Sequence, residues 1–169
     1  MDKRLIKKIA EGIDNGEKVD STIETKKHIE TVKEYCKRFA LELIVRAMNH
    51  DKSKLGDIEK PLFDEYTPKL KNSTYGSEEY KKFLEELKPA LDHHYENNSH
   101  HPEHYSNGIQ GMDLFDLVEM FFDWKAASKR HEDGNLLKSI DINKERFNMS
   151  DDLVAIFKNT ENRIIEKNK

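Results

Sequence analysis

The chain has few helix-breaking residues, a single cysteine and no long apolar run. It holds 4 prolines and 7 glycines among 169 residues. No apolar stretch approaches the roughly 18 residues of a membrane span, so we expect no membrane partner. The lone Cys36 cannot form a disulfide within the chain, which favours a buried thiol and a cytoplasmic location. Residues 1–13 lack a long apolar signal core and predict a short amphipathic helix.

Charge of one sign is not in large excess. Charged residues make up 37% of the chain, hydrophobic residues 36%, and the net charge is −4. This balance excludes a broad basic surface, so we expect no extended nucleic-acid surface. The length suits one domain with a real core, and we predict a single helical domain over residues 1–169.

Apolar residues recur at helical spacing, whereas alternating strand patterns are nearly absent. One long helix is predicted from Ser21, which has a capping-box spacing to Glu24. Residues 56–76 predict a loop with one short helix, and Pro89 should kink the next helix or start a new one. The sequence therefore predicts an all-α fold, a single-domain helical bundle of five to seven helices. The stripe of the first long helix is Ile29, Val32, Cys36, Phe39 and Leu43.

Three carboxylates follow one stripe of an otherwise apolar segment, "LFDLVEMFFDWKAA" at residues 114–127. Asp116, Glu119 and Asp123 lie three and four residues apart, which places them on one face of a helix. A helix that is apolar all round is normally buried, and buried carboxylates are paired or metal-bound. A partly exposed acidic face, or salt bridges to Lys and Arg, remains the alternative.

Five of the 8 histidines crowd into "HHYENNSHHPEHY", residues 93–105. His94 continues the inward stripe of the preceding helix, and His93 lies roughly 100° around the axis, at the edge of the same pocket. His101 follows in a turn that contains a proline. The density favours a metal or phosphate site over a solvated loop, and the missing cysteine partners exclude a zinc-finger pattern.

A His-Asp pair closes the first long helix. His50 and Asp51 are adjacent at its end, where the backbone can turn both side chains toward one ion. Lys54 follows three residues later and is placed to contact a substrate phosphate as a compact charge.

The string "NHDKSK", residues 49–54, is similar to the HD-x-G-K string of the HD-domain phosphohydrolase superfamily, with Ser53 in place of the usual glycine. That superfamily is all-helical, so the resemblance implies an HD-domain-like bundle. It binds one or two divalent metals through a His, a His-Asp pair and a later Asp. "HHYE" resembles the paired-histidine string of the subgroup that cleaves cyclic dinucleotides. The metal ligands implied by these resemblances are His28, His50, Asp51, His93, His94 and Asp123.

Over nearly its whole length the chain also resembles an uncharacterised family of bacterial and bacteriophage proteins. The strings that carry this resemblance are "HDKSKL", "YGSEEYK", "PALDHHYENNSHHPEH", "NGIQGMDLFDLVEMFFDWKAAS" and "INKERF". It implies no activity.

Together these patterns predict a metal-dependent phosphohydrolase acting on a nucleotide-like phosphoester. A ligand set of nitrogen and oxygen atoms without thiolate suits one or two ions of Mn, Fe, Mg, Ni, Co or Zn. Lys54 and His101 are the candidate catalytic residues, because cations stabilise the charge that develops on a phosphoryl group. Two alternatives stay open: a helical metal-binding or ligand-sensing protein without turnover, and a structural or interaction protein.

The metal hypothesis carries a structural condition. His28 and His50 are 22 residues apart with no proline or glycine between them. In one straight helix they would lie about 33 Å apart, too far to share an ion. We therefore expect a tight reversal around residues 37–41 that lays two antiparallel helices side by side and brings the two histidines level.

Overall fold

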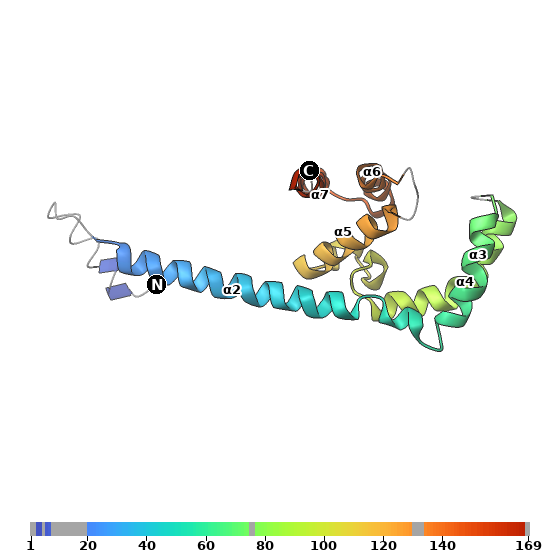
Figure 1. Cartoon of the computed structure of the whole chain (residues 1–169), viewed down its shortest axis with the longest axis horizontal. Coiled ribbons are helices and arrows are strands. Elements are labelled where there is room, and N and C mark those ends of the chain that lie inside the picture. Colours follow the sequence, from blue (N-terminus) through green and yellow to red (C-terminus); the bar gives the residue numbers. More distant parts are fainter. Residues whose placement is uncertain (1–2, 5, 8–19, 75–76, 130–133, 168–169) are drawn as a thin grey trace. The chain divides into compact units, whose positions relative to one another are not determined.

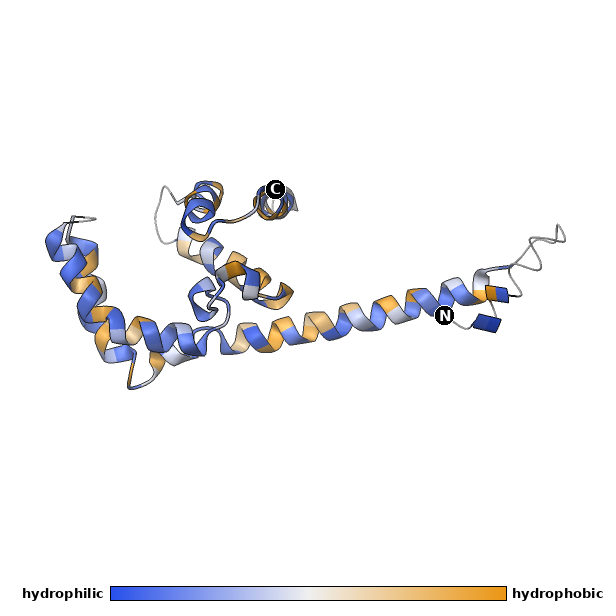
Figure 2. Ribbon diagram, turned by 180° about the vertical axis from the view of Figure 1, so that it is seen from behind, coloured by the Kyte–Doolittle hydropathy of each residue, from blue (hydrophilic) through white to orange (hydrophobic). Residues whose placement is uncertain are grey.

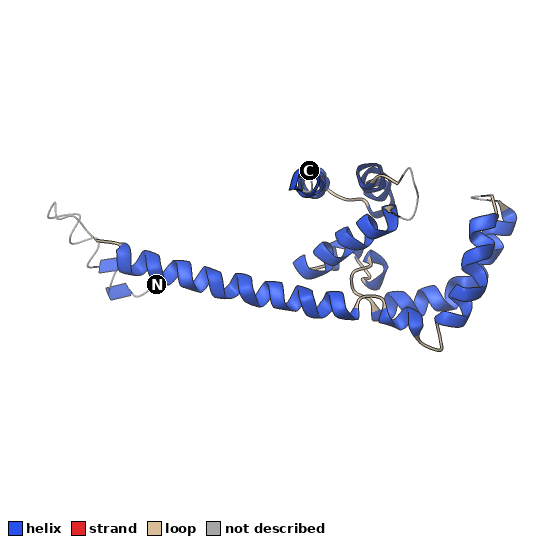
Figure 3. Cartoon of the chain, viewed as in Figure 1, coloured by secondary structure: helices blue, strands red, loops and turns tan. Residues whose placement is uncertain are grey.

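A computed structural model describes residues 3–4, 6–7, 20–74, 77–129 and 134–167. These residues form helices joined by turns, and no strand occurs among them (Figure 3). The predicted all-α class is confirmed. Most of the amphipathic helix predicted for residues 1–13 falls outside the described residues.

Six α-helices lie within the described ranges (Figure 1), which agrees with the five to seven predicted. Three short 3₁₀ helices, η1 to η3, occupy the turns. The chain divides into two compact units, residues 1–42 and 43–169, with the boundary inside the first long helix. The elements are α2 (Thr22–Asn49), η1 (Lys52–Leu55), α3 (Lys60–Asn72), α4 (Glu78–Asn97), η2 (Pro102–His104), η3 (Gly108–Gly111), α5 (Leu114–Ser128), α6 (Leu136–Phe147) and α7 (Asp151–Lys167).

Helix α2 runs from Thr22 to Asn49 without interruption, so the predicted reversal at residues 37–41 is wrong. The helix contains no residue that would break it, and its hydrophobic residues recur along its length (Figure 2). Ion pairs at i,i+3 spacing add to the local preference for helix. They join Glu24 to Lys27, Glu30 to Lys33, and Glu34 to Lys37.

Helices α3 and α4 pack against each other in the second unit. Tyr66 of α3 and Phe83 of α4 have ring centroids 6.2 Å apart. The 13-residue α3 fills most of residues 56–76, where the sequence predicted a loop with one short helix. Helix α4 continues through Pro89, which therefore does not start a new helix. The C-terminal end of α4 carries His93 and His94 to the first turn after α2.

The apolar core of the second unit lies between α5, α6 and α7. Trp124 stacks on Phe147 with ring planes 7° apart. This core fixes one side of α5 and leaves its acidic stripe to face the end of α2. Its buried members are Met120, Phe121, Leu136, Ile140, Met149, Val154 and Phe157.

In the described part of the chain, no helix combines the length and the apolar character that crossing a membrane requires. The prediction of a single domain over residues 1–169 stays a prediction.

Two isoleucines of α6 give a matched test of this core. Ile140 is 0% exposed, whereas Ile142 is 70% exposed. We expect Ile140→Ala to lower the free energy of unfolding by about 2–5 kcal/mol, because it removes buried methylenes and leaves a cavity. Ile142→Ala should change it by roughly 0.5 kcal/mol or less. Urea unfolding measures both, and equal losses would contradict the placement of α6.

Candidate metal centre

Asp51 has a backbone conformation that few residues adopt. Its backbone has φ 55° and ψ 16°, the left-handed region, between the end of α2 and η1. Aspartate tolerates this conformation better than most residues, but it is still uncommon outside glycine. The turn ends α2 and aims the Asp51 carboxylate back at the histidines of α4 and the following loop.

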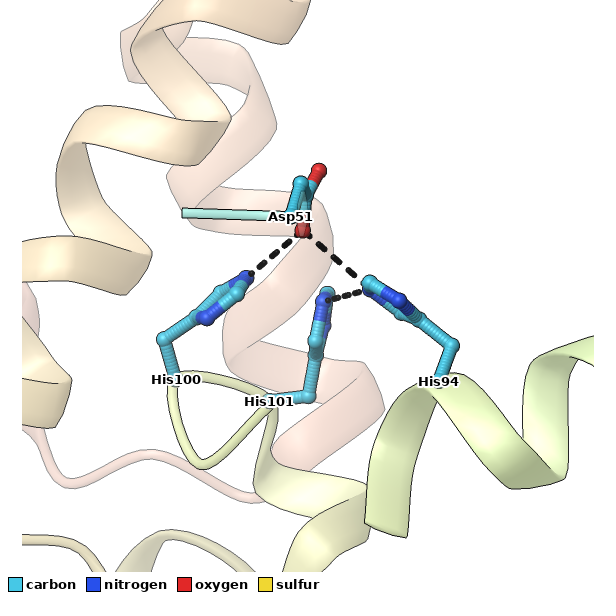
Figure 4. Close-up of side chains that lie close together, drawn as sticks. All are labelled: Asp51, His94, His100 and His101. Carbon is cyan, nitrogen blue, oxygen red and sulfur yellow. Dashed lines mark hydrogen bonds and ion pairs between the residues drawn. The ribbon is translucent and has the colours of Figure 1, made fainter. Parts of the chain in front are cut away.

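Three imidazoles and the Asp51 carboxylate converge on one point (Figure 4). Asp51 Oδ1 lies 3.3 Å from His94 Nε2 and 3.5 Å from His100 Nε2. His94 Nε2 is 2.9 Å from His101 Nε2. A tetrahedral ion with ligand distances of about 2.1 Å separates its ligand atoms by about 3.4 Å. The spacing of these atoms therefore fits one ion between them. We call Asp51, His94, His100 and His101 the inner group.

Two ligand atoms of the inner group have no hydrogen-bond partner among the described residues. They are Asp51 Oδ1 and His100 Nε2, both fully buried. An unpartnered buried polar atom costs about 1–3 kcal/mol, and more when it is charged. A cation at the centre of the group would satisfy both atoms at once, so the donor set fits a bound metal.

Glu119 and Glu59 contact the Nδ1 atoms of His50, His100 and His94. Glu119 Oε1 lies 2.8 Å from His50 Nδ1 and 3.2 Å from His100 Nδ1. The fully buried Glu59 places Oε2 3.0 Å from His94 Nδ1. Because a carboxylate only accepts hydrogen bonds, each Nδ1 carries the hydrogen and Nε2 is directed to the centre. Metal-ligating histidines are typically oriented in this way.

Arg46 anchors Glu119 from α2. Its Nε lies 2.8 Å from Glu119 Oε2, and one terminal nitrogen lies 2.6 Å from Asp116 Oδ1. Ser99 and Tyr105 donate hydrogen bonds of 2.6 Å to the two oxygens of Asp116. Burial, followed by the Asp116 hydrogen bond, raises the pKa of Tyr105 to about 12. The acidic stripe of α5 is thus paired rather than exposed at Asp116 and Glu119.

A second group lies beside the inner one and shares Asp51. His50 Nε2 is 3.5 Å from Asp51 Oδ2 and 3.7 Å from Asp123 Oδ1. The Lys54 ammonium contacts the same Asp51 Oδ2 at 2.6 Å. The two oxygens of Asp51 therefore face different groups, and Lys54 holds the position beside the second. His50, His100 and Glu119 also lie together, but there Glu119 meets Nδ1 atoms and so acts as an orienting residue.

The pKa values of the histidines in this site differ sharply from one residue to the next. Asp123, followed by Glu119, raises the pKa of His50 to about 10. Burial, followed by the charges of His100 and His94, lowers the pKa of His101 to about 3. Burial acts to raise the pKa of Asp51, but contacts with His100, His94 and Lys54 hold it well below its usual range. His101 is therefore neutral and ready to ligate, whereas His50 is protonated without a metal.

The structure brings together most of the predicted site residues. His50, Asp51, Lys54, His94, His101 and Asp123 lie in the two groups or in direct contact with them. His93 does not: its Nδ1 lies 2.7 Å from Glu59 Oε1, outside the groups that could hold an ion. His28 is also not brought in. It is exposed in the first unit and lies 22 residues before His50 on the unbroken α2. His28 is in none of the groups that could hold an ion, and its role as a ligand stays a prediction.

Sequence reasoning missed His100 and the two orienting glutamates. His100 is 1% exposed and central to the inner group. Its signal was the histidine density, which did not single it out from His101. Glu119 carried a signal in its position on the acidic stripe. Glu59 carried none, because it lies before α3 in a segment without clear periodicity.

The model of a family of unknown function, DUF5662, matches residues 17–166. No curated protein and no solved structure matches the chain significantly.

Removing ligands should empty the centre. We expect Asp51→Ala and His100→Ala to lower metal content severalfold in protein purified without a histidine tag, because each removes a ligand atom. His28→Ala should keep the full content. Elemental analysis measures the ion, and circular dichroism checks that helicity is retained. The rise in Tm that metal gives the natural protein should be lost with the ligands. Natural metal content in both ligand variants would contradict the assignment.

Metal binding should release protons. The raised pKa of His50, about 10, means that the metal-free protein keeps a proton there at pH 7.5. Protonated His50 stabilises the metal-free fold fully below its ordinary pKa of about 6.5, and the contribution is lost as pH rises through about 10. An ion must displace that proton, so metal affinity should fall as pH falls. Calorimetric titrations in two buffers of different ionisation enthalpy should give different heats, and equal heats would disprove this.

Proposed function

The chain belongs to the DUF5662 family of unknown function, and we propose that it is a metal-dependent hydrolase of phosphoesters. One observation carries the proposal. Asp51 Oδ1 and His100 Nε2 are buried without a hydrogen bond inside the inner group, which we also call the cage, and carboxylates orient two of its histidines, His94 and His100. Without a cation, Asp51 Oδ1 has only the 3.3 Å and 3.5 Å approaches of His94 and His100 Nε2, and neither forms a hydrogen bond, whereas a cation would bind all three atoms.

The resemblance to the HD-domain superfamily supports the proposal at particular positions. Of the ligands that it implies, His50, Asp51, His94 and Asp123 lie in the two groups that share Asp51. His101 joins them as a ligand rather than as the charge-stabilising residue that the sequence predicted. The nucleotide-like substrate stays a prediction from the resemblance. A divalent ion in the cage would polarise a phosphoryl oxygen and acidify water, which is the chemistry that phosphoester hydrolysis needs.

The residues around the cage divide the remaining work. Asp51 belongs to both groups, and each of its carboxylate oxygens would bind an ion in a different one. Lys54, with 35% of its side chain exposed, lies at the edge of the cage and can turn from Asp51 toward a phosphoryl oxygen. His50 lies beside Asp123 in the second group, where it would act as a ligand once its proton is displaced. Glu119, Glu59 and Arg46 position the histidines and touch no substrate.

A hydrolysis panel tests the function directly. Untagged protein is assayed with Mn²⁺, Mg²⁺, Fe²⁺, Ni²⁺, Co²⁺ and Zn²⁺ on nucleoside monophosphates, cyclic dinucleotides and aryl phosphates. Release of phosphate or of the cleaved ester, lost in Asp51→Ala, supports the proposal. Bound metal with no turnover on any class would favour the alternative of a metal-binding or sensing protein.

Lys54 gives the sharper prediction. Lys54→Ala should retain its metal, because it removes a competing cation from Asp51, yet lower kcat by about 100-fold, because a charge on the phosphoryl group is lost. Lys52→Ala is the matched control: Lys52 is exposed and bonds Asn49 instead. Turnover and metal content are measured on the same samples. Full activity of Lys54→Ala would mean that Lys54 does not contact the phosphoryl group and only lies near the end of a helix.

A further inference from the structure

A cavity of about 400 Å³ opens directly beside the second group, which consists of His50, Asp51 and Asp123. Its walls come from the last turns of α2 and from α5. Its polar residues are Arg46, His50, Glu119 and Asp123, and two of these, His50 and Asp123, belong to the second group. Whatever enters the cavity therefore reaches the centre. The apolar wall consists of Leu43, Ile44, Ala47, Val118, Phe122 and Ala126.

The wall is unsuited to a polar ligand. Its apolar side chains offer no hydrogen bond, and backbone groups within helices already bond one another. Arg46 is engaged by Glu119, Asp116 and Ser99. Glu119 is engaged by Arg46, His50 and His100. Sites that discriminate nucleobases or sugar hydroxyls present free donors and acceptors to them, whereas the polar groups left here, His50 and Asp123, both belong to the second group.

The wall is also partly open to water. Phe122 is 49% exposed and Ile44 is 56% exposed. The volume lies near the small end of ligand pockets, about 300–1,000 Å³, which suits a compact organic group. An apolar group held there would cover both side chains and gain the hydrophobic effect.

We propose that this cavity binds an alkyl or aryl group joined through oxygen to the phosphorus, so that the substrates are alkyl or aryl phosphates rather than nucleotides. This inference rests on the proposed hydrolysis and names its substrate class. In the reaction, the oxygen of water bonds to phosphorus and the P–O bond to the apolar group breaks. The leaving oxygen takes a proton and departs as an alcohol or phenol.

Binding of phosphonates tests the cavity without turnover, because their P–C bond is not hydrolysed. Calorimetry on the full chain loaded with Mn²⁺ compares phenylphosphonate, methylphosphonate and adenosine 5′-monophosphate. We expect phenylphosphonate to bind about tenfold more tightly than the other two, since only its ring is buried against the wall.

Two leucine variants of α5 localise the effect. Ala126→Leu fills the cavity and should reduce phenylphosphonate affinity to that of methylphosphonate while leaving methylphosphonate binding unchanged. Ala127→Leu is the matched control, because Ala127 is an exposed neighbour that does not line the cavity. It should change neither affinity. Circular dichroism and metal content confirm that both variants are folded and loaded.

The outcomes separate the two proposals. Equal binding of the two phosphonates, tighter binding of the nucleotide, or no effect of Ala126→Leu would overturn the cavity assignment while leaving hydrolysis intact. Failure of every phosphonate to bind overturns it as well. The expected discrimination, with no turnover of phenyl phosphate or of any other ester, supports the cavity as a ligand site and defeats the hydrolase proposal.

Discussion

The geometry of the centre depends on the buried contact of Arg46 with Asp116 and Glu119. Asp116 is 2% exposed and would be an unpaired buried carboxylate without Arg46, Ser99 and Tyr105. Breaking one side of such a pair typically costs about 3–5 kcal/mol, because the remaining charge stays buried. The contact also fixes Glu119, which orients His50 and His100. A single guanidinium thus joins the end of α2 to α5 and sets the direction of two imidazoles.

The inner group has the charge distribution that a bound cation requires. Asp51 is the only acid of the inner group, and three histidines face it. Without an ion, His101 stays neutral because burial and the neighbouring imidazoles lower its pKa to about 3. Lys54 meanwhile supplies positive charge to the outer oxygen of Asp51. The left-handed backbone of Asp51 also indicates a functional site, because uncommon backbone conformations persist where the surroundings impose them, often at such sites.

The sequence predicted the helices and most residues of the two groups, and it failed at the reversal in α2 and at Glu59 for different physical reasons. Helical spacing and rare glycine and proline are local signals, so the all-α fold followed from them. His94 was found because it continues the inward stripe of α4. The reversal in α2 was inferred from the need to bring His28 to the metal, against every local signal in that segment, and the local signals prevailed. Glu59 could not be found, because only the packing of α3 on α4 makes it buried.

Helix α5 unites the core, the centre and the cavity, which explains its near-complete apolar surface. Met120 and Phe121 face the core with α6 and α7. Glu119 and Asp123 face the histidines, and Val118 and Phe122 face the cavity. Because 3.6 residues make a turn, these three directions interleave along the helix. Only Asp116, Met120 and Phe121 of this helix are buried, so the contribution of an apolar residue on it depends on the direction in which it points. Phe121 stabilises the fold, whereas its neighbour Phe122, whose ring centroid lies 5.2 Å from that of Phe121, is 49% exposed and lines the cavity. That contrast within one pair of identical side chains is the strongest physical reason to regard the cavity as a place for a ligand.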